Sequence, residues 1–450
     1  MKPTDIRLRQ IEHSLDRIQY RSPMKFGGRV VTDVTLLNVT VEVETHAGKV
    51  GRGFGSMPLG NVWAWPSKTL SADQTLAAMT AVGQAVASPR FLSSEFAHPL
   101  DHCHALSAAY DTVARDVSSA QGLTEPMPRL AQLVAASPLE AAIFDAQGVA
   151  LQANAYNLLG PEFVSRDLSA YLTTDFAGEY LDRYTLRFPK PTMPLYHLVG
   201  ALDPLCAGDI AQPIGDGLPE TLPEWITFNG LTHLKIKLAG DDLAWDVARV
   251  IAVDINAAPA QQARGCTAWN YSLDFNEKCA NVEYVLDFLA QLQTTAPEAF
   301  ARVQYVEQPT HRDLRANPEN RMHRAAKIKP VVIDESLLDF ESLLLAREQG
   351  YSGVALKACK GHSEALLMGA AAQKFGLFLC VQDLTCVGAS FLHSASLAAR
   401  IPTIAAIEGN GRQYCPAGNR PWEARFPDMF TITNGTVGTH ELTGVGLGYS

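Results

Sequence analysis

Three acidic residues in the second half of the chain each come at the end of a short apolar run. They are Asp274 after "YSL", Glu307 after "RVQYV" and Asp334 after "PVVI". If these runs are neighbouring parallel strands, their ends lie about 4.8 Å apart, so the three carboxylates converge. Without a counter-charge they would repel one another and raise each other's pKa values. Because Mg²⁺ takes a few carboxylate oxygens and keeps open positions for substrate, the pattern predicts a Mg²⁺ site at these three residues.

Lysines stand on both sides of this acidic group. "LTHLKIKLAG" (231–240) puts Lys235 and Lys237 on one face of a strand, and Lys357 ends the run "GVALK" (353–357). We expect a carboxylate substrate to lie between these amines. Like charge on Lys235 would lower the pKa of Lys237 and make Lys237 a usable base, while the metal and the other cations stabilise an enediolate. The predicted chemistry is removal of a proton α to a carboxylate.

The elements that would position these groups repeat from about residue 190 onward. Eight apolar runs alternate with helix-like stretches: "LYHLVGA" (195–201), "HLKIKL" (233–238), "YSLDF" (271–275), "RVQYVE" (302–307), "PVVIDE" (330–335), "GVALK" (353–357), "LFLCVQD" (377–383) and "TIAAIE" (403–408). Eight β-then-α units fit a closed (β/α)₈ barrel of the TIM type over residues 190–415, with catalytic groups at the C-terminal strand ends. The alternative is an open doubly wound sheet, but no glycine-rich phosphate turn follows the first strand.

The first 180 residues predict a separate α+β domain that would cap the barrel. "TLLNVTVEVETHAGKVGRGFG" (35–55) alternates apolar and polar residues around a turn, which is typical of an antiparallel hairpin. Residues 73–90 and 100–120 read as helices. A third helix is expected over 137–160, with Ser137 as its cap and Pro138 at its first position. We leave open whether residues 415–450 return to this domain.

Composition limits the classes of partner. The chain has 450 residues, a net charge of −10 and no run of 18 apolar residues. This argues against a nucleic-acid or membrane partner and leaves room for a small carboxylate substrate. The eight cysteines are scattered, and "MKPTDIRLRQ" lacks a secretory apolar segment, so we expect reduced thiols in a cytoplasmic protein. We also expect a homo-oligomer.

Five motifs in order resemble the enolase superfamily, within it the mandelate racemase and muconate lactonizing enzyme group. They are "LKIKL", "LDFNE", "VEQP", "IDES" and "LKACKG", and "SPLEAAIFDAQGVALQANAYNLLG" and "GVGLGYS" are similar to the family's helix before the barrel and its terminus. The resemblance implies that Asp274, Glu307 and Asp334 bind Mg²⁺, that Lys237 and Lys357 are acid/bases on opposite faces, and that Lys235 is the neighbour of Lys237. It implies supporting roles for Asn276 and Glu335.

The same resemblance implies that two stretches of the N-terminal domain supply specificity loops. These are "QYRSPMKFGG" (19–28) and "FGSMPLGNVWAWP" (54–66), with Tyr20, Phe26, Met57 and Trp63 as candidate wall residues. Lys357, with "CVQDLT" on the next strand, follows the family's lysine–lysine pattern. Dipeptide epimerases of that pattern carry an aspartate pair on the eighth strand, where this chain has only Glu408. Gln382 and Asp383 on the seventh strand are further candidates, Asp383 as a reader of a substrate hydroxyl or amine.

Two lysines on opposite faces support racemisation or epimerisation, because one amine removes the proton and the other returns it. The same pair supports loss of water from a hydroxy acid such as a sugar acid, and we keep this dehydratase as the alternative. A cycloisomerase and a non-catalytic barrel homologue also remain open.

Overall fold

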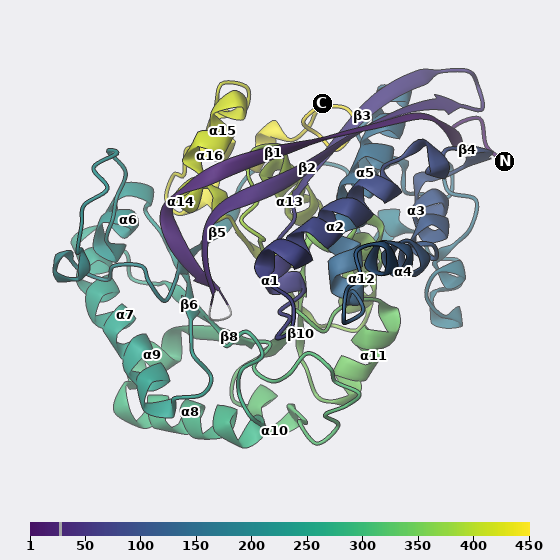
Figure 1. Ribbon diagram of the computed structural model, residues 1–450. Coiled ribbons are helices and arrows are strands. Elements are labelled where there is room, and N and C mark those ends of the chain that lie inside the picture. Colours follow the sequence, from purple (N-terminus) through teal and green to yellow (C-terminus); the bar gives the residue numbers. More distant parts are fainter. Residues whose placement is uncertain (27–28) are drawn as a thin grey trace.

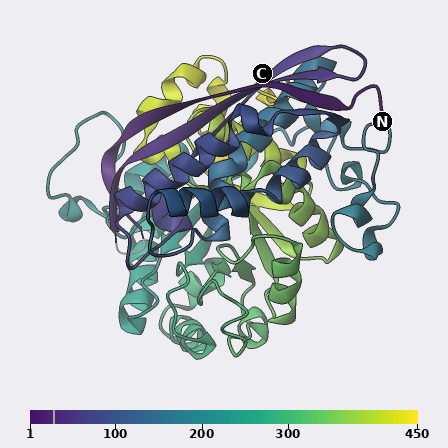
Figure 2. The same cartoon turned by 45° about the vertical axis from the view of Figure 1, so that its right-hand side comes forward.

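The computed structural model describes residues 1–26 and 29–450, with Phe26 described by its backbone alone. A parallel barrel forms one part of the molecule, and an antiparallel sheet with helices covers one side of it, as both views show (Figures 1 and 2). The expectation of a TIM-type barrel with an α+β cap is therefore confirmed. Of the helices in the described residues, none is long and apolar enough to cross a bilayer.

Eight parallel strands close the barrel. They are β5 (Met193–Val199), β6 (His233–Lys237), β7 (Asn270–Asp274), β8 (Val303–Glu307), β9 (Val331–Ile333), β10 (Gly353–Leu356), β11 (Phe378–Val381) and β12 (Ile404–Glu408). Each pairs with the next, and β12 pairs with β5, where Ile407 lies opposite Leu195. All eight strands predicted from apolar runs are present, and the open sheet is excluded.

Helices follow these strands along the chain and surround the barrel. They are α6 (Leu222–Asn229), α7 (Leu243–Ala263), α8 (Val282–Thr295), α9 (Pro297–Arg302), α10 (His323–Ala326), α11 (Phe340–Glu348), α12 (His362–Lys374), α13 (Ala389–Arg400), α14 (Gly411–Tyr414), α15 (Pro416–Glu423) and α16 (Pro427–Phe430). Side chains at the preceding turns cap several of them. Asp242 accepts the Trp245 N–H to begin α7, and Asn281 accepts the Tyr284 N–H to begin α8.

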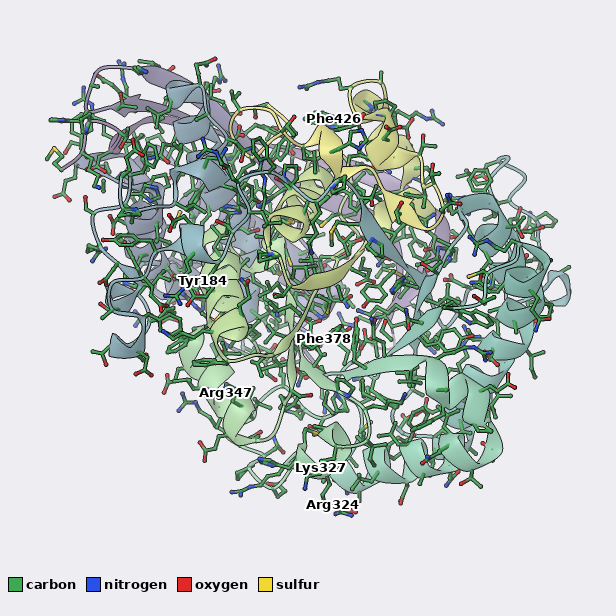
Figure 3. All side chains as sticks on the ribbon, turned by 180° about the vertical axis from the view of Figure 1, so that it is seen from behind. Tyr184, Arg324, Lys327, Arg347, Phe378 and Phe426 are labelled. Carbon is green, nitrogen blue, oxygen red and sulfur yellow. The ribbon has the colours of Figure 1, made fainter. Side chains whose placement is uncertain are left out.

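The alternation of side chains along each strand separates the barrel interior into layers. The lower layer is apolar and consists of Tyr196, Tyr305, Val332, Ala355, Cys380 and Ala406, with Phe378 of Figure 3 packed against it. Two residues further along five of these strands come Glu307, Asp334, Lys357, Gln382 and Glu408. Because side chains repeat their direction every second residue, this polar set lies directly above the apolar layer.

The cap is a four-stranded sheet in the order β3-β2-β1-β4 with helices on it. Its elements are β1 (Ile6–Phe26), β2 (Arg29–Thr45), β3 (Val50–Pro58), β4 (Ser93–Ala97), α1 (Asn61–Ala64), α2 (Ala72–Val86), α3 (Pro99–Ser107), α4 (Tyr110–Ala120) and α5 (Arg129–Leu151). The predicted 35–55 hairpin is confirmed as β2 and β3. In Figure 1 the long β1 and β2 strands run from the chain's start across the barrel.

The expectation that 19–28 is a loop is wrong for its described part, because residues 19–26 belong to β1. The register of β1 against β2 shifts between Leu8 and Gln10 and again between Gln19 and Met24. Each shift interrupts the two-residue repeat, so the strand lacks a continuous alternating pattern. Residues 27–28 lie outside the described residues.

The expected helix start at Ser137 is also wrong, because α5 begins at Arg129 and contains Pro138 in its interior. A proline lacks the N–H that would bond to the carbonyl four residues earlier, here that of Val134. The Ser137 hydroxyl donates to this carbonyl instead, at 2.9 Å. The local substitution of one donor for another lets the helix continue through the proline.

The C-terminal segment touches both parts of the molecule. Its short strand β13 (Thr436–Val437) pairs antiparallel with β5 of the barrel. Further on, the Leu447 N–H and the Ser450 hydroxyl both donate to Asp145 of α5, each at 2.7 Å to Oδ1. This segment therefore helps to hold the cap on the barrel.

Candidate active site

A cavity lies where the cap covers the C-terminal ends of the barrel strands. It encloses about 750 Å³, part of which is open to solvent. The barrel side is lined by charged residues at the strand ends: Lys235, Lys237, Asp274, Asp334, Lys357, Asp383 and Glu408. The cap side, formed mainly by β1, β2 and the segment around α1, is mostly apolar. Charged groups from six strands thus meet in one place beneath the cap.

Lys235 lies at the centre of the charged group and is 2% exposed. Its Nζ is 2.7 Å from Glu307 Oε1, 3.1 Å from Glu408 Oε2 and 3.2 Å from Asp274 Oδ2, and it donates to Gln382 Oε1 at 2.8 Å. Burial alone would lower the pKa of Lys235, but the three carboxylates outweigh burial and hold the pKa well above its ordinary value. Lys235 therefore neutralises carboxylates from three strands.

Lys237 pairs with the first carboxylate of the series. Its Nζ lies 2.5 Å from Asp274 Oδ2 and 2.9 Å from Asn276 Oδ1. Burial opposes the charge on Asp274, but Lys237 and Lys235 outweigh burial and lower its pKa to about 2. The amide of Asn276 also donates to Glu335 Oε1 at 3.2 Å, so this asparagine connects the β7 end with the β9 end.

Lys357 lies against a tryptophan of the cap. Its Nζ is 2.9 Å from Asp334 Oδ2 and 3.9 Å from the centre of the Trp63 ring. Lys360 also binds Asp334, at 3.0 Å from Oδ1. The Trp63 indole N–H donates to Glu335 Oε1 at 2.9 Å. Burial would lower the pKa of Lys357, but Asp334 outweighs burial and raises it, and the ring face also favours the charged amine.

The three carboxylates of Asp274, Glu307 and Asp334 end three adjacent strands, with Asp274 directly opposite Glu307. Burial and the charge of Asp274 raise the pKa of Glu307 well above its ordinary value, and Glu307 Oε2 has no hydrogen-bond partner. Among the described residues, no three acidic, histidine or cysteine side chains are arranged closely enough to hold a metal, and Lys235 and Lys357 lie against these carboxylates. The chemistry of the three oxygen donors, their position at adjacent strand ends and the unpartnered Glu307 oxygen fit Mg²⁺.

The carboxylates at the ends of β11 and β12, Asp383 and Glu408, already have hydrogen-bond or ion-pair partners within the protein. Asp383 Oδ1 accepts the backbone N–H groups of Leu384 and Cys386, and Oδ2 accepts that of Asn410. Burial and the charge of Glu408 raise the pKa of Asp383 to about 6. These contacts brace the loops after β11 and β12, although both acids also line the cavity.

The remaining predicted polar residues lie just outside the cavity. Gln382 holds Lys235 and donates to the Tyr305 hydroxyl at 2.5 Å, so it connects the polar layer with the apolar layer below. Glu335 is 2% exposed, and its Oε1 accepts hydrogen bonds from the Trp63 indole N–H and the Asn276 amide. Burial and neighbouring carboxylates raise the pKa of Glu335 to about 7.

Among the wall residues predicted from the cap, Tyr20 and Trp63 line the cavity. Met57 does not: it is fully buried and contacts the Cys386 sulfur at 3.7 Å. It shares the face of β3 that carries Gly53 and Gly55, and this face packs on α5. The side chain of Phe26 lies outside the described residues.

Sequence reasoning did not single out several residues that the structure brings to the site. Lys360 lies in the turn after β10, and Asn410 lies two residues beyond β12. Their positions just past barrel strands are the signal that could have identified them, since such positions supply the site in this fold. Met24 and Leu384 of the apolar wall carry no comparable signal.

Comparisons with known proteins agree with this geometry. A family profile described as "Enolase C-terminal domain-like" matches residues 220–450. Comparison with curated protein sequences gives no match.

Solved structures resemble the chain over nearly its whole length. The L-Ala-D/L-Glu epimerase from Bacillus subtilis is 17% identical, with a TM-score of 0.62 and 98% of each chain covered. A mandelate racemase/muconate lactonizing protein from Herpetosiphon aurantiacus is 21% identical, with a TM-score of 0.59 and 99% of each chain covered. An enolase from Bradyrhizobium, complexed with magnesium and mandelic acid, is 16% identical with a TM-score of 0.63, covering 99% of this chain and 96% of that one. Because the family profile covers residues 220–450, the whole barrel apart from its first strand and the loop after it, the chain belongs to the enolase superfamily.

Proposed function

We propose that the protein is a Mg²⁺-dependent racemase or epimerase that moves the proton α to a substrate carboxylate. The observation that carries this proposal is the placement of Lys237 and Lys357 around one cavity. Lys237 ends β6 and Lys357 follows β10, four strands away in a barrel of eight. The two amines therefore reach the cavity from opposite sides, as a two-base proton transfer requires.

The residues between them suit the charge that such a reaction creates. Mg²⁺, held by Asp274, Glu307 and Asp334, would supply positive charge against the negative charge that develops on the substrate carboxylate. Lys235 carries further positive charge next to this set. Lys237 takes the proton from one face of the α carbon, and Lys357 delivers a proton to the other.

Two named neighbours support this class without fixing the substrate, since one is an epimerase and one is complexed with mandelic acid. We further propose a reducing, cytoplasmic location, which is supported by eight cysteines that are all free thiols.

The test follows hydrogen exchange at the α carbon in D₂O with Mg²⁺. Both enantiomers of mandelic acid and of N-acetylated amino acids are incubated with the protein, and deuterium incorporation is measured by NMR. We expect the Lys237→Ala variant to lose exchange with one enantiomer and the Lys357→Ala variant to lose exchange with the other, because each amine serves one face.

Lys327→Ala is the matched control, since Lys327 is exposed at the edge of the molecule (Figure 3) and does not line the cavity. Folded lysine variants that exchange both enantiomers at the wild-type rate would refute the two-base proposal. Formation of a 2-keto acid from a 2,3-dihydroxy acid such as a sugar acid, by loss of water through an enol, would assign the protein to the dehydratases instead.

A further inference from the structure

A second cavity lies between α6 and the segment that runs from α14 to α16 (Figure 1). It encloses about 800 Å³, part of which is open to solvent, and none of the described residues lines both this cavity and the active-site cavity. Most of the wall is apolar and includes Leu218, Phe430 and Phe228, of which Phe228 is 60% exposed. Two charged side chains, Arg412 and Glu423, complete the wall.

Arg412, which is partly exposed, uses only some of its hydrogen-bond donors. Its Nη1 donates to Asn229 Oδ1 at 2.6 Å, its Nη2 donates to His197 Nδ1 at 2.7 Å, and its guanidinium carbon lies 5.2 Å from the centre of the Trp225 ring. Asn229 and Trp225 also line the cavity, which places the charged end of Arg412 at its wall. A guanidinium has five N–H groups, so three of them, including Nε–H, lack an acceptor in the part of the chain that the structure describes.

The charge of this guanidinium is not balanced by the protein. Its partners are uncharged, because Asn229 is an amide and burial, together with the charge of Arg412, keeps the pKa of His197 well below its ordinary value. Burial lowers the pKa of Arg412 to about 9, so the guanidinium is still charged at neutral pH. Within the described residues no carboxylate forms an ion pair with Arg412, and the nearby Glu423 is exposed. A cation largely removed from water without a counter-charge is costly, and an anion offsets this cost.

We infer that this second cavity binds a small monocarboxylate that carries an apolar or aromatic group. The two oxygens of a carboxylate match the fork of N–H donors on the Arg412 guanidinium. The apolar group packs against Leu218, Phe228 and Phe430 and removes their accessible surface from water. Glu423 disfavours a dianion such as a phosphate monoester in the same cavity, because like charges repel. This binding site is separate from the active-site cavity and does not depend on the proposed function.

The test measures the binding of benzoate by calorimetric titration at low ionic strength without Mg²⁺, with benzamide as the neutral analogue of the same shape. We expect the wild type to bind benzoate about tenfold or more tightly than benzamide, and Arg412→Gln to weaken benzoate binding by about the same factor. Arg420→Gln is the matched control, because Arg420 is an exposed arginine of α15 that does not line the cavity. Lys237→Ala should also keep the wild-type Kd for benzoate, which separates this site from the active site.

Glu423→Gln gives a readout that does not depend on the folding of the Arg412 variant, since Glu423 is exposed. Because a like charge leaves the cavity, benzoate should bind about twofold to fivefold more tightly, with an unchanged Kd for benzamide. Failure of the wild type to bind benzoate, equal affinities for benzoate and benzamide, or an unchanged benzoate Kd in folded Arg412→Gln or in Glu423→Gln overturns the inference. Loss of benzoate binding in Lys237→Ala overturns it as well. None of these results bears on the proposed function, which exchange at the α carbon tests in the other cavity.

Discussion

Buried ion pairs dominate the site at the scale of single residues. Each lysine that lines the cavity contacts at least one buried carboxylate, and Lys235 contacts three. Such pairs are costly to desolvate, so their net contribution to stability is small, but removing one partner leaves a charge buried without compensation.

Lys235→Met tests this balance. We expect the variant to lose about 3–5 kcal/mol of unfolding free energy without metal, because Glu307, Glu408 and Asp274 then lack their shared cation. Millimolar Mg²⁺ should restore part of the loss. Urea unfolding measures both effects, and the exposed Lys327→Met should change stability by less than about 0.5 kcal/mol. A Lys235→Met protein as stable as the wild type without Mg²⁺ would contradict the assignment.

Trp63 makes two separable contacts across the boundary between cap and barrel. Trp63→Phe keeps a ring over Lys357 and removes the donor to Glu335, so we expect the free energy of unfolding to fall by about 1–3 kcal/mol. Trp63→Leu also removes the ring and should cost a further 0.5–2 kcal/mol, roughly. Denaturant unfolding measures both, with Trp245→Phe, at an exposed tryptophan of α7, as control. Equal stability of wild type and Trp63→Phe would show that the hydrogen bond contributes nothing.

At the scale of elements, α5 contacts both the barrel and the sheet of its own domain. Its contact with the barrel is made by Glu140, which accepts the Ser363 N–H at 3.1 Å and its hydroxyl at 2.5 Å, and also the Tyr110 hydroxyl of the cap. Ser363 lies in the first turn of α12, where a negative charge is favoured by the helix dipole. α12 begins directly after the turn that carries Lys360. By binding the first turn of α12, Glu140 therefore also fixes the end of this turn.

The other contact of α5 is with β3, where the glycines of "GRGFG" face the helix backbone. A Cβ on Gly53 would lie 2.1 Å from the Ala146 nitrogen, and a backbone atom cannot rotate away. We expect Gly53→Ala to cost about 3 kcal/mol or more in an unfolding experiment. Gly48→Ala, at a turn with φ of +84° and open space around it, should cost about 1–2 kcal/mol from backbone strain alone. If Gly53→Ala and Gly48→Ala lost similar amounts of unfolding free energy, close packing of β3 on α5 would be contradicted.

At the scale of the whole molecule, several histidines are buried in the neutral form. Burial lowers the pKa of each of them: His98, His102, His197, His233, His362 and His393. His98 is the clearest case, because its Nδ1 accepts the Leu100 N–H that begins α3 and its Nε2–H donates to the Leu158 carbonyl. Protonation of Nδ1 would remove the cap of this helix.

The pKa of His98 falls from 6.5 to about 4 on folding. Between these values the unfolded chain binds a proton that the folded chain does not, so stability is complete above pH 6.5 and is lost as pH falls toward 4. The loss amounts to about 3 kcal/mol for this residue. His98→Asn keeps a helix-capping acceptor and cannot titrate there. The stability difference between wild type and variant should therefore shrink by about that amount from pH 7 to pH 4, and parallel curves would refute the assignment.

Much of the barrel could be predicted from the sequence because its signals are local. A short apolar run followed by a helix-like stretch specifies one β/α unit, and eight units specify closure. The acids and lysines at the strand ends were predicted to meet for the same reason, since parallel strands of a closed sheet place their ends at one edge. The structure brings Lys235, Lys237, Asp274, Asp334 and Lys357 to one cavity.

The cap was predicted less well because its signals depend on distant contacts. The register shifts of β1 hide its alternation, and Pro138 is tolerated in α5 because the Ser137 hydroxyl replaces the lost N–H bond. Met57 turns away from the cavity because its face of β3 packs on a helix far away in the chain.

The sequence by itself determined which chemical groups the protein has and, through the period of its strands, which end of the barrel carries them. Only the tertiary structure decided which of these groups remain available to a ligand. Glu408 and Asp383 looked available, yet backbone N–H groups and a lysine occupy them, while the Oε2 atom of Glu307 is left without a partner. The physical reason is that hydrogen bonds between residues far apart in sequence consume donors and acceptors, and no local pattern records that competition.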